Sequence, residues 1–188
     1  GERLVVFASE RDEVIQYTTK GNNPTEIVEL HTDFKLTDGG EYLALVDPNG
    51  RVVHEFAPVY ADQFENVSYG FAGNGVDESP GYMETPTPGG PNDTVFPAVA
   101  RKPTITNASD DTPVSTHAFT DDFEIEISRP EPDAVIHFTI DGSIPDASSP
   151  VASGPISITE STEIRTISIV PGQIPSRVRA EEFFKVDA

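Results

Sequence analysis

The sequence predicts an all-β protein: two antiparallel β-sandwiches in tandem, joined by a linker rich in proline and glycine. Three observations support this fold class. Apolar residues gather in short runs rich in β-branched and aromatic side chains, which are typical of strands. The 17 prolines and 14 glycines among 188 residues favour short strands with tight turns over long helices. No segment keeps a helical period for more than two turns.

The first half is expected to form a meander of strands connected by tight turns. Asp47-Pro48-Asn49-Gly50 is one such turn, because proline fixes φ and glycine supplies a positive φ. Asp38-Gly39-Gly40 makes a similar turn one strand earlier. A short helix fits only at Ala8–Gln16. The predicted strands are Leu4–Ala8, Glu26–Leu30, Phe34–Leu36, Glu41–Asp47, Val52–Ala57 and Val67–Phe71.

A change in composition divides the chain near residue 93. Residues 73–93 are dominated by turn formers, and Thr85–Asn92 is too rich in proline for a helix or a central strand. Pro97 and Pro103 continue this stiff segment. The sequence therefore predicts a first domain at residues 1–92, a linker at 93–103 and a second domain at 104–188.

The second half restarts the strand pattern. Phe123–Ser128 alternates apolar residues with glutamate, as a half-buried strand of an antiparallel sheet does. In Ala134–Ile140, Ile136, Phe138 and Ile140 share one face. Turn clusters at 141–145 and 171–175 separate strands at a spacing typical of a β-sandwich. The remaining predicted strands are Ile156–Thr159, Thr162–Val170 and Arg179–Val186.

Both halves of the chain are acidic. Twelve Lys and Arg stand against 32 Asp and Glu, for a net charge of −20. A split near residue 95 leaves 5 basic and 17 acidic residues before it, and 7 basic and 15 acidic after it. This balance argues against binding to nucleic acid or to an anionic membrane, since both need basic groups. It fits a solvated acidic surface, a salty environment or multivalent cations.

Five motifs in the first half resemble the bacterial lamin-tail domain. They are Leu4–Ser9, Glu29–Leu36, Gly40–Gly50, Val67–Gly70 and Thr85–Asn92. The resemblance implies an immunoglobulin-like β-sandwich without enzymatic activity. Such domains begin with strands upstream of the Leu4–Ala8 run, so the first module is expected to lack its first strands. An exposed strand edge should follow, with either an intermolecular strand contact or mobility in this domain.

Motifs in the second half are similar to the C-terminal β-sandwich of chitobiase and β-hexosaminidase enzymes. They are Ala134–Ile140, Asp141–Pro145, Ser153–Ile158, Thr162–Thr166 and Pro175–Val178. The resemblance implies an immunoglobulin-like accessory module that recurs in exported bacterial proteins. That family commonly has Thr where this chain has Asp146 and an aromatic residue where it has Ala152, which weakens any inference about a surface ligand.

No catalytic site is predicted, so an enzyme is not expected. The chain has no cysteine, and no serine lies in a Gly-x-Ser-x-Gly motif. The glycine-rich Gly70–Gly75 lacks the lysine and the helix that phosphate binding needs. The histidines show no zinc-binding spacing, and they are His31, His54, His117 and His137. His54 and His137 fall within predicted strands and are expected to be structural.

Calcium is the one cofactor that the sequence leaves open. Calcium binds six to eight oxygen ligands on loops, and aspartates flank two loops of the second half. No segment has the spacing of an EF-hand, and aspartate also favours turns through its own hydrogen bonds. The candidate ligands are Asp110, Asp111, Asp121, Asp122, Asp141 and Asp146.

Exposed aromatic rings are the candidate glycan contacts. The favoured residue, tryptophan, is absent. Tyr17, Tyr60, Phe71 and Tyr82 lie in turn-rich segments, and we take Tyr60 and Tyr82 as the candidate contacts. The alternative is that these rings fill the ends of the sandwich.

Together these features predict a non-catalytic structural or interaction module of a larger exported bacterial surface protein, which positions or anchors neighbouring domains. The alternative is a carbohydrate-binding accessory module of a neighbouring hydrolase. The expected partners are other domains of the same polypeptide and a protein or polysaccharide at the cell surface. Neither nucleic acid nor direct membrane insertion is expected. The expected location is secreted, periplasmic or at the cell surface.

Overall fold

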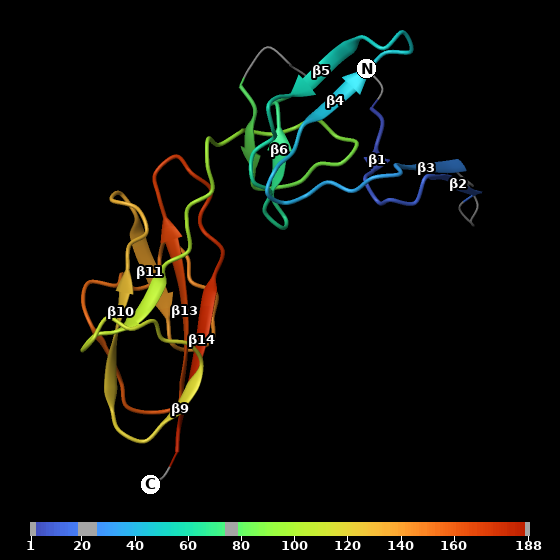
Figure 1. The fold of residues 1–188 in the computed structure, drawn as a ribbon. Coiled ribbons are helices and arrows are strands. Elements are labelled where there is room, and N and C mark those ends of the chain that lie inside the picture. Colours follow the sequence, from blue (N-terminus) through green and yellow to red (C-terminus); the bar gives the residue numbers. More distant parts are fainter. Residues whose placement is uncertain (1–2, 19–25, 74–78, 187–188) are drawn as a thin grey trace. The chain divides into compact units, whose positions relative to one another are not determined.

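The computed structural model describes residues 3–18, 26–73 and 79–186 (Figure 1). These residues form strands and no helix, so the predicted all-β class is confirmed. The chain divides into two compact units, Gly1–Val95 (unit 1) and Phe96–Ala188 (unit 2). The division falls within the range predicted as a linker. Within the described ranges, no helix is available that could span a bilayer.

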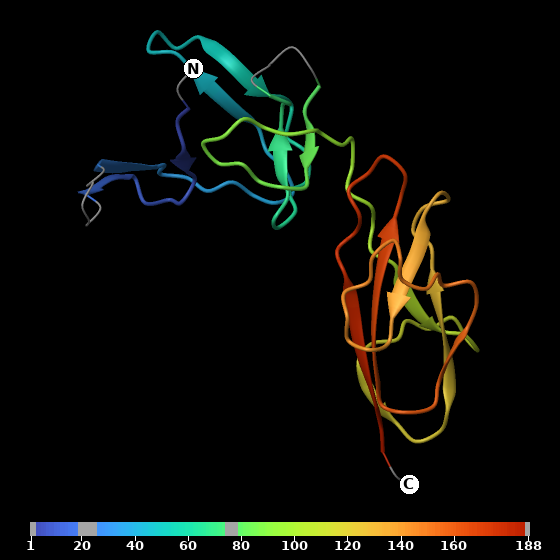
Figure 2. The ribbon, with the colours of Figure 1, turned by 180° about the vertical axis from the view of Figure 1, so that it is seen from behind.

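Unit 1 is built from small separate sheets (Figure 2). A three-stranded sheet has the order β1-β3-β2, in which β1 is parallel and β2 antiparallel to β3. Two antiparallel pairs, β4 with β5 and β6 with β7, form the other sheets. The strands are β1 Val6–Phe7, β2 Glu13–Thr18, β3 Glu26–His31, β4 Leu43–Val46, β5 Val52–Phe56, β6 Ser68–Gly70 and β7 Gly81–Met83.

The short helix expected at Ala8–Gln16 is wrong, because this part of the chain contributes to β2. Glu10 and Asp12 have φ of 59° and 47°, in the left-handed region that a right-handed helix excludes. They turn the chain so that Glu13–Thr18 pairs with β3 along all six residues. The β-branched residues Val14 and Ile15 suit this strand.

Two further segments of unit 1 differ from the prediction. Phe34–Leu36 forms no strand and makes only the isolated bridge between Lys35 and Ser9. Gly81–Met83, expected to be a turn region, forms the fully buried strand β7. This strand is only three residues long, and the proline and glycine around it favour the prediction of a turn.

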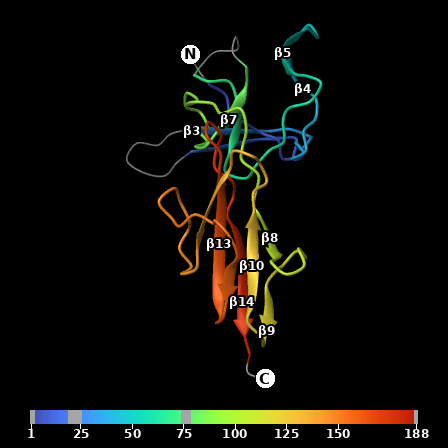
Figure 3. The ribbon, with the colours of Figure 1, turned by 90° about the vertical axis from the view of Figure 1, so that its left-hand side faces the viewer.

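Unit 2 is a sandwich of two sheets (Figure 3). One sheet has the order β12-β10-β8 and the other the order β11-β13-β14-β9. All neighbours are antiparallel except β14 and β9. The strands are β8 Thr104–Asn107, β9 His117–Phe119, β10 Phe123–Ser128, β11 Val135–Thr139, β12 Ile156–Ile158, β13 Thr162–Ile169 and β14 Arg179–Lys185. Strands β8 and β9 were not predicted.

A single core lies between these two sheets. Its fully enclosed side chains come from both sheets, and they are Ile105, Ile125, Ile158, Ile136, Ile164 and Phe183. Burying one such side chain stabilises the fold by roughly 1.5–3 kcal/mol. Ile140 was expected to share the inner face with Ile136, but it is 58% exposed because β11 ends at Thr139.

Candidate functional site

The predicted calcium ligands of the loop that follows β11 are used in local turns. The Asp141 carboxylate accepts hydrogen bonds from the Ser143 hydroxyl at 2.6 Å and the Ser143 backbone N–H at 3.0 Å. Asp146 accepts the same pair of bonds from Ser148 at 2.6 and 2.8 Å. The hydroxyl donors, followed by the backbone donors, hold the pKa of both carboxyl groups below the usual range.

The loop between β8 and β9 is organised in the same way. Asp110 accepts the Thr112 hydroxyl at 2.7 Å and the Thr112 N–H at 3.1 Å, and these bonds lower the pKa of Asp110. Asp111 has a φ of 57° and donates its own N–H to the Asn107 carbonyl at 3.0 Å. Both aspartates therefore shape the turn itself.

The last two candidate calcium ligands, Asp121 and Asp122, each contact a different neighbouring residue. The Asp121 carboxylate accepts the Thr120 hydroxyl at 3.3 Å, whereas Asp122 forms an ion pair with Lys185 at 2.6 Å. Across residues 3–18, 26–73 and 79–186, no group of three or more acidic or histidine side chains converges as a metal site would require. The structure thus does not bring the six predicted ligands together.

The two candidate tyrosines are not exposed platforms. Tyr60 is 5% exposed, and its hydroxyl donates to the Thr37 carbonyl at 2.7 Å. Tyr82 is 7% exposed and donates to the Asp62 carbonyl at 2.9 Å. The expectation of open rings here is wrong, because both side chains are buried and both hydroxyl groups donate to backbone carbonyl groups. They belong to the small core of unit 1.

The other two aromatic candidates are placed differently. Phe71 is half-buried, and its ring packs against His54 and Phe56 at centroid distances of 5.2 and 5.8 Å. The Tyr17 side chain lies outside the described part of the chain. Of the glycine-rich motif Gly70–Gly75, the last two residues also lie outside it.

The histidines are dispersed over both units. His54 lies in β5 and His137 in β11, as predicted for structural residues. His137 is 7% exposed, and its Nδ1 lies 2.8 Å from the Ser149 carbonyl oxygen. His117 is exposed and its Nδ1 lies 2.7 Å from the Ser115 carbonyl oxygen.

One constellation escaped the sequence analysis because its members are distant in sequence. Ser9 Oγ lies 2.8 Å from His31 Nδ1, and His31 Nε2 lies 3.5 Å from Glu29 Oε2. The N–H groups of Glu10 and Arg11, which follow the serine, already donate to carbonyl groups across the sheet at 3.1 and 2.9 Å. They are therefore engaged and do not form an oxyanion hole beside Ser9. This set ties the segment after β1 to β3.

A shallow groove of about 500 Å³ lies at one end of the unit 2 sandwich. It combines hydroxyl, carboxylate and aromatic groups, and its lining includes Thr112, Ser115, His117, Asp121 and Phe123. His117 packs edge-on against the core residue Phe183 at 5.3 Å, which fixes its ring at the groove.

The Asp141 turn belongs to one of the motifs on which the second resemblance rested, and the two-sheet sandwich is the architecture that the resemblance implied. Residues 113–180 match the family model of the Chitobiase/beta-hexosaminidase C-terminal domain. The chitobiase-type match runs from the loop before β9 into β14, so it includes the groove residues from Ser115 to Phe123. None of the curated proteins matches the chain. The match does not reach unit 1, where the lamin-tail resemblance stays a prediction.

A second groove, of about 400 Å³, runs along β4 in unit 1. One wall is the extended segment Phe34–Leu36, and the other is β4 with the residues before it. We call it the β4 groove, and its lining residues are Phe34, Lys35, Leu36, Glu41, Tyr42, Leu43, Ala44 and Val46. The Glu41 carboxylate accepts a hydrogen bond from the Tyr60 hydroxyl at 3.1 Å, so a buried residue holds the Glu41 side chain.

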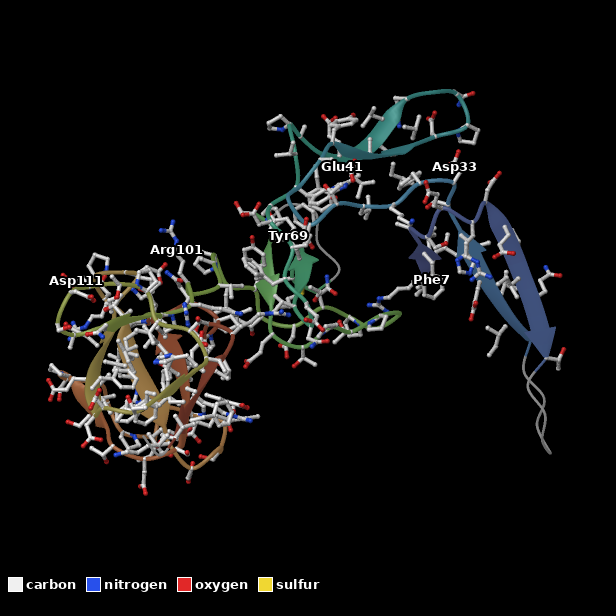
Figure 4. All side chains as sticks on the ribbon, turned by 60° about the horizontal axis from the view of Figure 1, so that its bottom comes forward. Phe7, Asp33, Glu41, Tyr69, Arg101 and Asp111 are labelled. Carbon is white, nitrogen blue, oxygen red and sulfur yellow. The ribbon has the colours of Figure 1, made fainter. Side chains whose placement is uncertain are left out.

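A smaller, mainly apolar cavity of about 120 Å³ adjoins the β4 groove. Leu36 and Leu43 line both spaces, and Phe56, Tyr60, Gln63 and Tyr69 complete the cavity. Figure 4 labels Tyr69 and Glu41 in this part of unit 1. Gly40, with a φ of 83°, permits the close approach, because a Cβ there would overlap the Tyr60 carbonyl oxygen.

The β4 groove is part of a wider lack of burial in unit 1. Among the described residues, its buried apolar side chains are Tyr60, Tyr82 and Met83. Its large apolar side chains that are exposed are far more numerous: Leu4, Val5, Val6, Phe7, Val14, Val28, Phe34, Leu36, Tyr42, Leu45, Val46, Val52, Val53 and Val59. Unit 1 therefore leaves more of its large apolar side chains in contact with solvent than it encloses.

Proposed function

We propose that the chain is a non-catalytic structural and interaction module of a larger exported bacterial surface protein, in which it positions or anchors neighbouring domains. One observation carries the proposal: unit 2 encloses its apolar side chains between two sheets, whereas unit 1 leaves most of its own in contact with solvent. Unit 2 then serves as a self-contained accessory sandwich, and unit 1 supplies the contacting surface.

The domain assignment within this proposal follows the two resemblances. Residues 1–92 are a lamin-tail-type module, 93–103 are a linker, and 104–188 are the accessory sandwich. The chitobiase-type match supports the last part, since its name describes the C-terminal domain of chitobiase and beta-hexosaminidase. The proposal includes no cofactor, and it places the protein outside the cytoplasm.

Calorimetric titration of the full chain tests the non-catalytic proposal. Chitin oligomers, soluble glucans and calcium chloride are the titrants, and a chromogenic N-acetylglucosaminide is the substrate for a parallel turnover assay. We expect neither saturable heat nor turnover. Turnover that persists in a preparation purified by a second route, and that is lost on Ser9→Ala, would overturn the proposal.

A carbohydrate-binding accessory function is the second candidate, and the groove beside His117 favours it. This groove lies largely within the chitobiase-type match and presents hydrogen-bonding groups next to the Phe123 ring. Chitin trimers should then bind saturably. Asp121→Ala, within the groove, should abolish the binding, whereas Asp133→Ala, an exposed aspartate that does not line the groove, should leave it unchanged.

A further inference from the structure

The free edge of β4 indicates what kind of partner unit 1 binds. This inference rests on the proposed interaction function. In the described part of unit 1, β4 pairs with β5 and with no second strand. An unpaired edge presents backbone N–H and C=O groups that another extended segment can bond. The β4 groove lies along this strand and is bounded on its other side by Phe34–Leu36.

Apolar side chains define what the groove accepts. Leu36 and Leu43 lie between the groove and the apolar cavity below it. Phe34 and Leu36 are 45% and 42% exposed. A strand laid beside β4 would direct alternate side chains toward these residues, because side chains of a strand alternate between two faces. The occupant therefore needs an apolar residue at every second position.

The charge around the β4 groove predicts which residues the occupant carries at its other positions. The basic side chain of the groove, Lys35, already pairs with Glu10 at 2.6 Å, and Arg51, at the hairpin turn, pairs with Asp47 at 3.7 Å. The Glu55 carboxylate accepts the Tyr42 hydroxyl at 2.7 Å and remains at the surface.

Acidic charge also dominates beyond the groove. Asp33 and Asp38 add exposed carboxylates on the segment that forms the other wall and on the turn after it. Unit 1 as a whole carries 17 acidic against 5 basic residues. A basic occupant is attracted by this field, whereas an acidic one is repelled.

We infer that the β4 groove binds an extended segment of another polypeptide in which apolar and basic residues alternate, and that this segment adds to the sheet as a strand beside β4. Strand addition of this kind draws affinity from backbone hydrogen bonds and specificity from alternate side chains. A second copy of this chain is disfavoured, because each copy carries a net charge of −20.

A synthetic peptide of alternating valine and lysine, ten residues long and fluorescently labelled, is the probe. We expect it to bind the full chain saturably, and to bind about tenfold more weakly when the salt concentration rises from 50 to 500 mM. A peptide of the same composition with its valines in one block should bind at least about tenfold more weakly, because it cannot present an alternating face.

Two groove variants and one matched control locate the site. Leu36→Lys and Phe34→Lys place a charge on the groove wall and should each weaken binding about tenfold. Leu45→Lys makes the same change in charge at a residue of β4 that is 65% exposed and does not line the groove. It should leave the affinity within twofold of the parent chain. Thermal unfolding verifies that each variant is folded. If one groove variant does not fold, the other is sufficient to test the site.

Three results would overturn the inference: equal affinity for the alternating and the blocked peptide, equal losses in the groove and control variants, or concentration-dependent dimerisation that the groove variants abolish. The last would identify a second copy as the occupant. Failure of the proposed function is separate, since that would show as turnover or glycan binding whatever the peptide does.

Discussion

The two units differ in how the hydrophobic pattern of a strand matches the burial of its side chains. In unit 2, β10 alternates apolar and acidic residues, and its inner Ile125 and Ile127 are buried beneath the facing sheet. In unit 1, β4 is apolar at every position, and yet Leu45 and Val46 are exposed. Continuous apolar strands are typical of positions covered on both faces. The comparison teaches that an alternating strand shows which of its faces is buried within its own unit. A continuously apolar strand with an exposed face, such as β4, indicates a second face that another segment would bury.

The tyrosines make this comparison measurable. All five tyrosines lie before residue 95, and the chain has no tryptophan. Tyrosine fluorescence therefore reports unfolding of unit 1, whereas far-ultraviolet circular dichroism reports strands of both units.

The largest expected effect is loss of the unit 2 core. Phe183 is fully buried between the sheets and contacts Phe123 and His117 edge-on at 5.5 and 5.3 Å. Phe183→Ala should lower the free energy of unfolding of unit 2 by about 3–5 kcal/mol. Leu45→Ala, at an exposed residue of unit 1, should change that of unit 1 by less than about 0.5 kcal/mol. Urea unfolding followed by both signals measures the two values, and similar losses would erase the contrast between the units.

The small core of unit 1 should be sensitive to alkaline pH. Burial, with a smaller contribution from the Asp62 charge, raises the pKa of Tyr82. The unfolded chain ionises this phenol near pH 10, so the stabilisation is complete below that pH and is lost as the pH rises through the folded pKa. Tyr82→Phe should cost about 0.5–1.5 kcal/mol at pH 8 through the lost hydrogen bond.

The same variant should also reduce the decline in stability above pH 10. Tyr42→Phe should reduce this decline less, because Tyr42 is 53% exposed and its pKa is raised mainly by its hydrogen bond to Glu55 at the surface. Urea midpoints followed by tyrosine fluorescence at pH 8 and pH 10.8 provide the measurement. An unaltered alkaline decline in the Tyr82 variant would show that this phenol does not couple to unfolding.

Unit 2 contains a defect that a substitution should repair. Thr166 in β13 is fully buried, and its hydroxyl has no hydrogen-bond partner among the described residues. A buried hydroxyl without a partner is unfavourable, so Thr166→Val should stabilise unit 2 by about 1 kcal/mol. Thr162→Val in the same strand should not, because the Thr162 hydroxyl donates to the Glu160 carbonyl at 3.0 Å. A lower melting temperature for Thr166→Val would contradict this account.

Much of the fold followed from local pattern. Phe123–Ser128 was predicted at its observed bounds because a period of two is unambiguous over six residues. The turn at 47–50 forms as expected: Gly50 has a φ of 83°, and the Asp47 carboxylate accepts the Asn49 N–H at 2.9 Å. These features depend on neighbouring residues, which the sequence displays directly.

What could not be predicted depends on contacts between distant segments. Strand β9 has three residues and is placed by parallel pairing with β14, more than 60 residues later. The burial of Tyr60 and Tyr82 likewise depends on the Thr37 and Asp62 carbonyls reaching their hydroxyls. The β4 groove depends on Phe34–Leu36 lying along β4 without joining the sheet. No local pattern encodes which of two nearby extended segments will pair.

The smallest expected effect concerns the acidic turns of unit 2. The Ser143 hydroxyl and N–H lower the pKa of Asp141, so the turn contributes its stability above the unfolded pKa, near 4, and loses it as the pH falls through the folded value. Asp141 is exposed, so solvent limits the size of this contribution. Ser143→Ala should move the Asp141 pKa, measured by NMR titration, upward toward that of an unstructured aspartate. The pKa of Asp146, which the Ser148 hydroxyl lowers in the same way, should be the same in this variant as in the parent chain. An unmoved Asp141 pKa would mean that the Ser143 backbone N–H alone holds the carboxylate in the turn, and would contradict a contribution from the hydroxyl.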